Sequence, residues 1–300
     1  GGPLVIGTAG TCGADAAVDW LLDITREIAA EDGMALRVAT LRSGQQAATV
    51  KSALAAGRIR ALPAAPEISA ELLDSCTNIV ALAGAEQIAA ALATGADIVI
   101  AGRTTDTAII AALPITRGDN AGAAWHGAKV GECGALATTQ PNSGVIQIDF
   151  DADGFTIEPM AQAAAATPYT VSAHMLYENS DPYILYEPGG HLDVTGSDYR
   201  ALDARRVRVE GSKWVPGRYT VKLEGARVVG YQSVGLAVIR DRHYVRHARA
   251  WATDIEQQVR AKIETRMGLA PDEFAVELRL IGMDATLGGI ENRHDLPVEV

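Results

Sequence analysis

The stretch VIGTAGTCGADAAVDW, residues 5–20, joins a short apolar run to an amphipathic pattern through a loop with glycine at every third position. The apolar run has the composition of a buried strand, and the pattern after the loop is typical of a helix. One interpretation of the loop is a tight turn between the two. The other is an anion site, because a glycine-rich loop that opens a helix offers unpaired backbone N–H groups and partial positive charge.

The same strand-then-helix order repeats over the first 140 residues. Four apolar runs are typical of buried strands: PLVI (3–6), ALRVATL (35–41), NIVALAG (78–84) and ADIVIAG (96–102). Three stretches have helical spacing of Leu, Ile and Ala: DWLLDITREIAAED (19–32), QQAATVKSALAAG (45–57) and AEQIAAALATG (85–95). This alternation predicts an α/β fold with a mainly parallel sheet wrapped by helices, in a domain over residues 1–140. Ligands of such sheets bind beyond the carboxyl ends of the strands, where the loops GTAGTCG (7–13) and GRTTDT (102–107) lie.

The pattern changes near residue 140 to alternating β-formers with glycine turns. SGVIQIDFDADGFTIEP (143–159) predicts a hairpin that turns at Asp153-Gly154, and residues 205–239 are dense in alternating β-formers. A helical pattern returns over residues 244–268, and EFAVELRLIGMDA (273–285) predicts another strand. We therefore expect a β-rich α+β domain over residues 141–300.

Composition excludes several classes of partner. The formal net charge of -11 argues against a nucleic-acid binder, which gathers Lys and Arg on one face. No apolar run reaches the roughly 18–20 residues of a membrane helix, and no basic-then-apolar leader opens the chain, so we expect a cytoplasmic protein without a membrane partner. The three cysteines form no C-x-x-C pair and are expected to be reduced thiols. The chain opens and stops on strand-like runs, which predicts a fragment of a longer protein.

The first loop contains Gly7, Thr8, Gly10, Thr11 and Gly13. Its spacing is neither G-x-G-x-x-G nor the P-loop pattern, and no Lys follows to neutralise a polyphosphate. A nucleotide is therefore a poor candidate ligand. The alternatives that remain are a site for a carboxylate or a single phosphate and a tight strand-to-helix turn.

The second loop follows a buried strand with Arg103, Thr104, Thr105 and Asp106. A guanidinium fork and two hydroxyls at one sheet edge can clamp a substrate carboxylate. In the structural alternative, Asp106 caps the following helix and Arg103 pairs with it.

The stretch AWHGAKVGECGAL (124–136) has helical spacing that places His126, Lys129, Glu132 and Cys133 roughly one turn apart. His126, Lys129 or Glu132 can move a proton, with the lysine or histidine tuned by the neighbouring carboxylate. A solvated helix face with ordinary charge pairs is the alternative, and Cys133 then serves as a small core residue.

The stretch SAHMLYENSDPYILYEPGGHLDVT (172–195) lacks regular periodicity and is rich in polar and aromatic residues. Loops of this kind often carry chemistry. The candidates in it are His174, Tyr177, Glu178, Tyr183, Glu187, Gly189, Gly190, His191 and Asp193. We predict that Glu187, Gly189 and Gly190 bind substrate, whereas packing tyrosines and a simple Pro-Gly-Gly turn are the alternative. His and carboxylate side chains also suit a metal, but neither H-x-H nor H-E-x-x-H spacing is present, so no metal site is predicted.

Several parts of the chain point to one known family: these loops, the helix at 124–136, the stretch TPYTVSAHMLYENSDPYILYEPGGHLDVT (167–195) and the β-rich run from Arg205. Together they resemble the acyclic terpene utilisation AtuA-like family over nearly the whole chain. The family name comes from gene clusters that degrade acyclic terpenoids such as citronellol and geraniol through coenzyme A thioesters. The resemblance implies a catabolic enzyme. It also implies further sequence before and after this chain.

The chemistry of the loops leads to one functional hypothesis and one alternative. The hypothesis is a lyase or hydratase that acts on a carboxylic acid or acyl-CoA thioester without a redox or other cofactor. Arg103 would hold a carboxylate, Gly7 to Gly13 an oxyanion, and His126, Lys129 or Glu132 would move the proton. The alternative is a non-catalytic subunit that uses the β-rich half as an interface. In either case we expect a homo-oligomer or a partner subunit.

Overall fold

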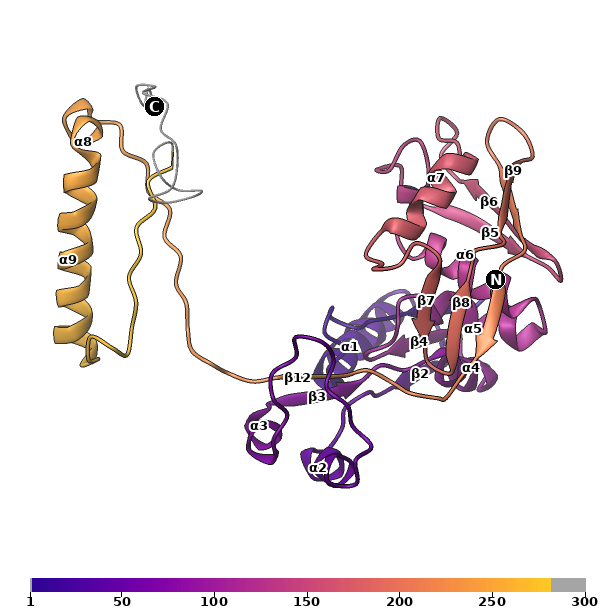
Figure 1. Ribbon diagram of the computed structural model, residues 1–300, viewed down its shortest axis with the longest axis horizontal. Helices are drawn as coiled ribbons and strands as arrows, with labels where there is room; N and C mark the ends of the chain where they lie inside the picture. The colour runs from indigo at the N-terminus through magenta and orange to yellow at the C-terminus, as the bar shows by residue number, and fades with distance from the viewer. Residues whose placement is uncertain (1, 282–300) are drawn as a thin grey trace. The chain divides into compact units, whose positions relative to one another are not determined.

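The computed structural model describes residues 2–281 (Figure 1). The chain forms two compact units, of which the first comprises residues 1–229 and the second begins at residue 230.

A parallel three-stranded sheet organises the start of the first unit. Its order is β1 (Leu4–Ile6), β4 (Ile98–Ala101), β2 (Val38–Leu41), and both pairings are parallel. The central strand β4 is covered on both faces, and its residues 99–101 have no exposed surface. Because β1 and β4 are parallel neighbours, the loops that follow them open at the same sheet edge, as the sequence predicts.

One predicted strand pairs elsewhere. β3 (Asn78–Ala81) forms antiparallel pairs with β12 (Leu223–Ala226), a strand from the second half of the chain, and the two lie side by side in Figure 1. The Ala81 N–H also donates to Ser43 O at 2.9 Å. The expectation that this run joins the parallel sheet is therefore wrong, because an apolar run shows that a strand is buried and not which strand it pairs with.

Helices cover the sheet and connect its strands. The longer ones are α1 (Asp15–Glu31), α2 (Ala47–Ala55), α4 (Ala85–Ala93), α5 (Ala108–Arg117) and α6 (Ala121–Gly131), and the short α3 spans Ala70–Ser75. Local signals set several ends: the Asn120 side chain caps α6 at the Ala123 N–H, and α5 stops at Gly118 in the left-handed conformation. α5 and α6 pack against each other, and α6 is buried along nearly its whole length.

The remainder of the first unit is built from antiparallel strands. A four-stranded sheet has the order β5 (Ile146–Phe150), β6 (Gly154–Pro159), β10 (Val207–Glu210), β9 (Asp198–Ala201), and a three-stranded sheet has the order β11 (Lys213–Pro216), β8 (Gly190–Asp193), β7 (Ile184–Glu187). Phe150 pairs with Phe155 across the predicted hairpin. The short segments η1 (Gly134–Ala137), α7 (Pro168–Ala173) and η2 (His174–Leu176) complete this part. The α/β start and β-rich continuation predicted from the sequence are confirmed.

α6 contributes to the core of the antiparallel part. Ala123 and Val130 pack with Phe155, Ile157 and the buried residues of β10. Gly127 lies so close to the Phe150 and Phe155 rings that a side chain there would collide with them. The domain boundary near residue 140 stays a prediction.

The second unit contains the predicted helix as two segments, α8 (Arg242–Arg246) and α9 (Ala248–Met267), which ends at Gly268 in the left-handed conformation. The predicted strand over residues 273–285 is absent from its described part, residues 273–281, and the rest lies outside the described residues. An alternating pattern without a neighbouring strand has no ladder of hydrogen bonds to form. Within residues 2–281, no helix is both long enough and apolar enough to cross a membrane.

Candidate active site

The two loops at the sheet edge contact each other directly. The Ala9 N–H donates to Ala101 O at 3.0 Å, and the Arg103 N–H donates to Gly13 O at 3.2 Å. Gly13 has φ +65°, and a side chain at this position would collide with the backbone of Arg103. This glycine is thus required both by its conformation and by the approach of the second loop.

Arg103 is held by a carboxylate from a distant strand. Its Nε donates to Glu224 Oε2 at 2.8 Å and its Nη2 to Glu224 Oε1 at 3.4 Å, while Nη1 donates to Thr8 Oγ1 at 3.2 Å. The hydrogen bond to Glu224 raises the pKa of Arg103, and Arg103 in turn lowers the pKa of Glu224. The partner of Arg103 is therefore Glu224 rather than Asp106, which is exposed. The binding of a substrate carboxylate by Arg103 stays a prediction. In the structure, the guanidinium of Arg103 already binds the carboxylate of Glu224.

Two residues of this edge are unusual. Thr104 is fully buried, and its Oγ1 has no hydrogen-bond partner among the described residues. Thr11 has φ +63°, a conformation that costs a β-branched residue energy and that collects at functional sites. Helix α1 begins after Ala14 without a side-chain cap, so the Thr11 hydroxyl does not serve as one. Gly10, at φ +59°, is exposed beside Thr11.

A buried polar cluster begins at the start of α5. The hydroxyl of Thr107 donates to Glu187 Oε1, and Thr105 Oγ1 lies 3.2 Å from Thr107 Oγ1. The second oxygen, Glu187 Oε2, is buried without a partner in the described chain. Burial raises the pKa of Glu187 to about 7, against the opposing effect of the threonine hydroxyls. Glu187 therefore exchanges its proton near neutral pH.

A buried ion pair lies within electrostatic range of Glu187. Lys129 is 3% exposed, and its Nζ donates to Glu132 Oε1 and, at 2.8 Å, to Tyr177 O. Burial raises the pKa of Glu132, although Lys129 opposes the shift. The negative charge of Glu132 raises the pKa of Glu187, and the positive charge of Lys129 lowers it. The structure thus brings three predicted site residues into one electrostatic neighbourhood.

His174 and Cys133 extend this cluster. His174 is 5% exposed, and its ring stacks on Tyr177 with centroids 5.4 Å apart. Burial, aided by the charge of Lys129, lowers the pKa of His174 to about 4. One donor atom each from Glu132, Cys133 and His174 lie within 4.8 Å of one another.

His126 occupies a different environment from Lys129 and Glu132. Its Nδ1 lies 2.7 Å from Ser212 Oγ, its Nε2 lies 3.1 Å from the Tyr199 hydroxyl, and its ring meets Phe155 edge-on. Complete burial lowers its pKa to about 3, so the ring is neutral. Both ring nitrogens are engaged inside the core, and the role of His126 in proton transfer stays a prediction.

Of the two glycines predicted to bind substrate, Gly189 lies in the turn between β7 and β8, and Gly190 begins β8. Gly189 has φ +88°, and a side chain at Gly190 would collide with Val215 O. The geometry of this turn positions Glu187 at the end of β7.

The sequence names His174 among the candidates of residues 172–195 but predicts no role for Thr107 or Glu224. Thr107 directly follows Thr105 and Asp106, so its position in the loop is a usable signal. Glu224 lies in an ordinary strand pattern without any signal.

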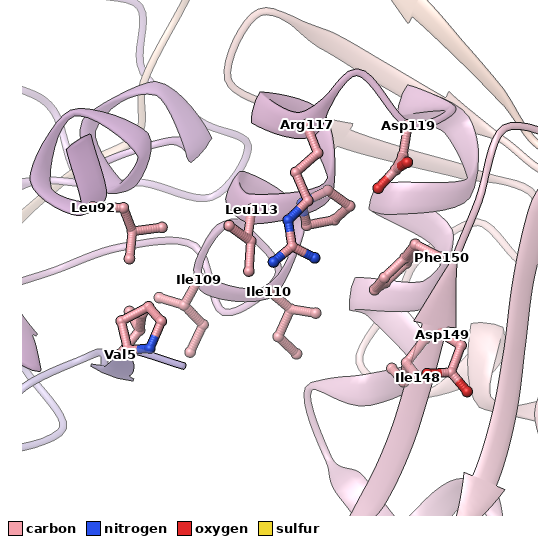
Figure 2. Close-up of a pocket in the computed structure, with 12 residues that line it drawn as sticks. Val5, Leu92, Ile109, Ile110, Leu113, Arg117, Asp119, Ile148, Asp149 and Phe150 are labelled. Carbon is pink, nitrogen blue, oxygen red and sulfur yellow. The ribbon is translucent and has the colours of Figure 1, made fainter. Parts of the chain in front are cut away.

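A cavity of about 430 Å³ lies beside α5 (Figure 2). Apolar side chains and three charged ones, Arg117, Asp119 and Asp149, line it, and the guanidinium of Arg117 projects into it. None of the predicted site residues lines this cavity. Of the residues that line it, Ile109 also lies beside Gly7 of the first loop, and Ile110 lies beside Gly131 at the end of α6.

Comparison with known proteins identifies the family. The family described as Acyclic terpene utilisation family protein AtuA matches residues 2–297. The chain belongs to the AtuA family. No curated protein and no solved structure matches it. The family is one of acyclic terpene utilisation, and the AtuA family match leaves the reaction itself open.

Proposed function

We propose that this AtuA family member is an enzyme that acts on a carboxylic acid or acyl-CoA thioester in acyclic terpene degradation. Its reaction is of the lyase or hydratase type, in which a proton is added or removed next to a carbonyl group, and it needs no redox cofactor. The observation that carries the proposal is Glu187, a buried carboxyl with one unpartnered oxygen and a pKa of about 7.

Glu187 has the properties of a general acid or base. A group that titrates near the working pH both holds and releases a proton readily. The hydroxyl of Thr107 orients one carboxyl oxygen, so the other oxygen is left for the substrate. Lys129 supplies a buried positive charge within range of this carboxyl. Such a charge stabilises the negative oxygen that develops when a proton leaves the carbon beside a carbonyl.

The cavity beside α5 suits the hydrocarbon part of such a substrate. Its lining includes Val5, Leu92, Ile109, Ile110 and Leu113. Burial of an apolar chain against these residues is favourable by about 0.8 kcal/mol per CH₂ group.

The test uses the whole protein with CoA thioesters and free acids of acyclic terpenoids. In deuterated water, mass spectrometry detects proton removal as deuterium uptake and hydration as the gain of one water. We expect turnover by the native protein and a loss of roughly 10²–10⁴-fold in Glu187→Gln. Glu27→Gln, at an exposed position on α1, is the matched control and should keep full activity. Equal turnover by Glu187→Gln would refute the role of Glu187.

The alternative is a non-catalytic subunit of a catabolic complex. One observation favours it: large apolar side chains at the start of the second unit are exposed in the described chain, namely Tyr231, Val234, Leu236 and Val238. Contiguous exposed apolar residues are typical of interaction surfaces. Absence of deuterium uptake, hydration and elimination with every thioester and acid would favour this alternative over the enzyme.

A further inference from the structure

We propose that Glu132, Cys133 and His174 form a binding site for a divalent transition-metal ion of the zinc type. The proposal does not depend on the reaction suggested above. It rests on three observations: the convergence of three donor atoms, an unpartnered histidine nitrogen and the orientation of the glutamate.

The three donors converge from two segments that are distant in sequence. Glu132 and Cys133 directly follow α6, and His174 begins η2. Their donor atoms lie within 4.8 Å of one another. In a tetrahedral zinc site with bonds of 2.0–2.3 Å, ligand atoms are roughly 3.3–3.8 Å apart. Side-chain movements of about 1 Å are therefore enough to close the site around an ion.

His174 has a nitrogen without a hydrogen-bond partner. The residue is 5% exposed, and its Nε2 is buried with no donor or acceptor in reach among the described residues. Such a group costs roughly 1–3 kcal/mol unless something satisfies it. A metal ion bound at the ring removes this cost.

Glu132 is held as metal-ligating carboxylates usually are. Lys129 donates to Oε1, and the lysine is fixed in turn by Tyr177 O. Hydrogen bonds of this outer kind orient a ligand and are a common feature of metal sites. In the proposed site the second oxygen of Glu132 binds the ion while Lys129 holds the first.

The donor set selects the class of metal. One thiolate, one imidazole and one carboxylate suit Zn²⁺ or Co²⁺, whereas Mg²⁺ and Ca²⁺ prefer oxygen ligands alone. Binding releases the thiol proton of Cys133 to solvent, and the two negative ligands then balance the two charges of the ion. Three protein ligands leave a fourth position open to water or a substrate oxygen.

Cobalt titration of the purified metal-free protein tests the site. Tetrahedral Co²⁺ bound by a thiolate gives visible d–d bands and a near-ultraviolet charge-transfer band. We expect one equivalent of Co²⁺ to produce both in the native protein and in the control Cys12→Ser, where an exposed cysteine is replaced. Cys133→Ser should lose the charge-transfer band, and His174→Ala should bind at least tenfold more weakly. Native protein without these bands, or a charge-transfer band that persists in Cys133→Ser, would overturn the proposal.

X-ray absorption of the zinc-loaded native protein provides a measurement that needs no variant. The proposed site predicts a coordination shell with one sulfur and the remaining ligands nitrogen or oxygen. A shell of nitrogen and oxygen alone would place the ion elsewhere and refute the assignment. This readout is independent of catalysis, so it remains informative if the proposed enzymatic reaction is wrong.

Discussion

Replacement of Glu187 by Gln should make the stability of the protein less dependent on pH. Gln has nearly the same shape, and its amide oxygen can still accept the hydrogen bond from Thr107. It cannot ionise, however. The variant therefore isolates the free-energy cost of a buried carboxylate charge.

The magnitude follows from the pKa of Glu187, which burial raises from 4.5 to about 7. Below the lower value, the carboxyl is protonated in both the folded and the unfolded protein and no cost arises. Between pH 4.5 and 7, the unfolded protein ionises this carboxyl while the folded protein keeps it protonated, so the cost grows until the folded protein also ionises the group near pH 7. At 1.36 kcal/mol per pKa unit, the full cost reaches about 3 kcal/mol. Glu187→Gln should thus gain about 3 kcal/mol relative to the native protein between about pH 4.5 and 8.5.

Urea denaturation across this pH range measures the difference. Fluorescence of Trp125 and Trp214, which stack in the same unit with centroids 5.1 Å apart, reports unfolding. Replacement of the unpartnered Oε2 by an amide NH₂ group adds an offset that does not vary with pH, so the slope of the difference carries the result. Glu27→Gln, which removes one carboxylate at an exposed position on α1, serves as control. A constant difference between Glu187→Gln and native protein would show that Glu187 does not ionise within this range, and the assignment as acid or base would fail.

Three further predictions concern the loops at the sheet edge. Arg103→Lys keeps the charge but cannot form the bidentate contact with Glu224. We therefore expect weaker binding of the carboxylic acid or thioester, and a free energy of unfolding that is lower by about 1 kcal/mol in urea denaturation. Unchanged affinity would mean that Arg103 has a structural role alone. Thr11→Val should lower the affinity for the ligand in calorimetry while Tm stays within about 1 °C of the native value, because the N-cap of α1 is Ala14 and no hydroxyl caps this helix. A destabilised variant with intact affinity would exclude an anion site at this loop. Gly13→Ala should destabilise the fold by more than about 2 kcal/mol, because residue 13 has φ +65° and the added methyl group would collide with the backbone of Arg103. A Tm equal to that of the native protein would contradict this packing.

Much of the architecture is predictable from local pattern. The apolar runs that became β1, β2 and β4 carry their own periodicity, as do the amphipathic stretches that became α1, α2 and α4. Crossover connections that contain helices bring such strands into parallel order. The meeting of the two loops at one edge follows from that order. The turn at Asp153-Gly154 is equally local, because its residue types specify it.

Only the tertiary structure decided which residues from distant parts of the sequence contact each other. No local signal connects Arg103 with Glu224, Thr107 with Glu187 or Cys133 with His174. Each pair forms because packed strands and helices bring separate segments together.

The pKa values of the site residues were also decided only by the tertiary structure. The sequence by itself determined that Lys129, Glu132 and Glu187 are titratable and that they lie in two stretches with candidate functional residues, 124–136 and 172–195. The tertiary structure decided that they are buried in one polar cluster, while His126 lies among Phe155, Tyr199 and Ser212. The reason is physical: a pKa depends on the water and the charges around a group, and both are set by segments that the neighbouring sequence does not specify.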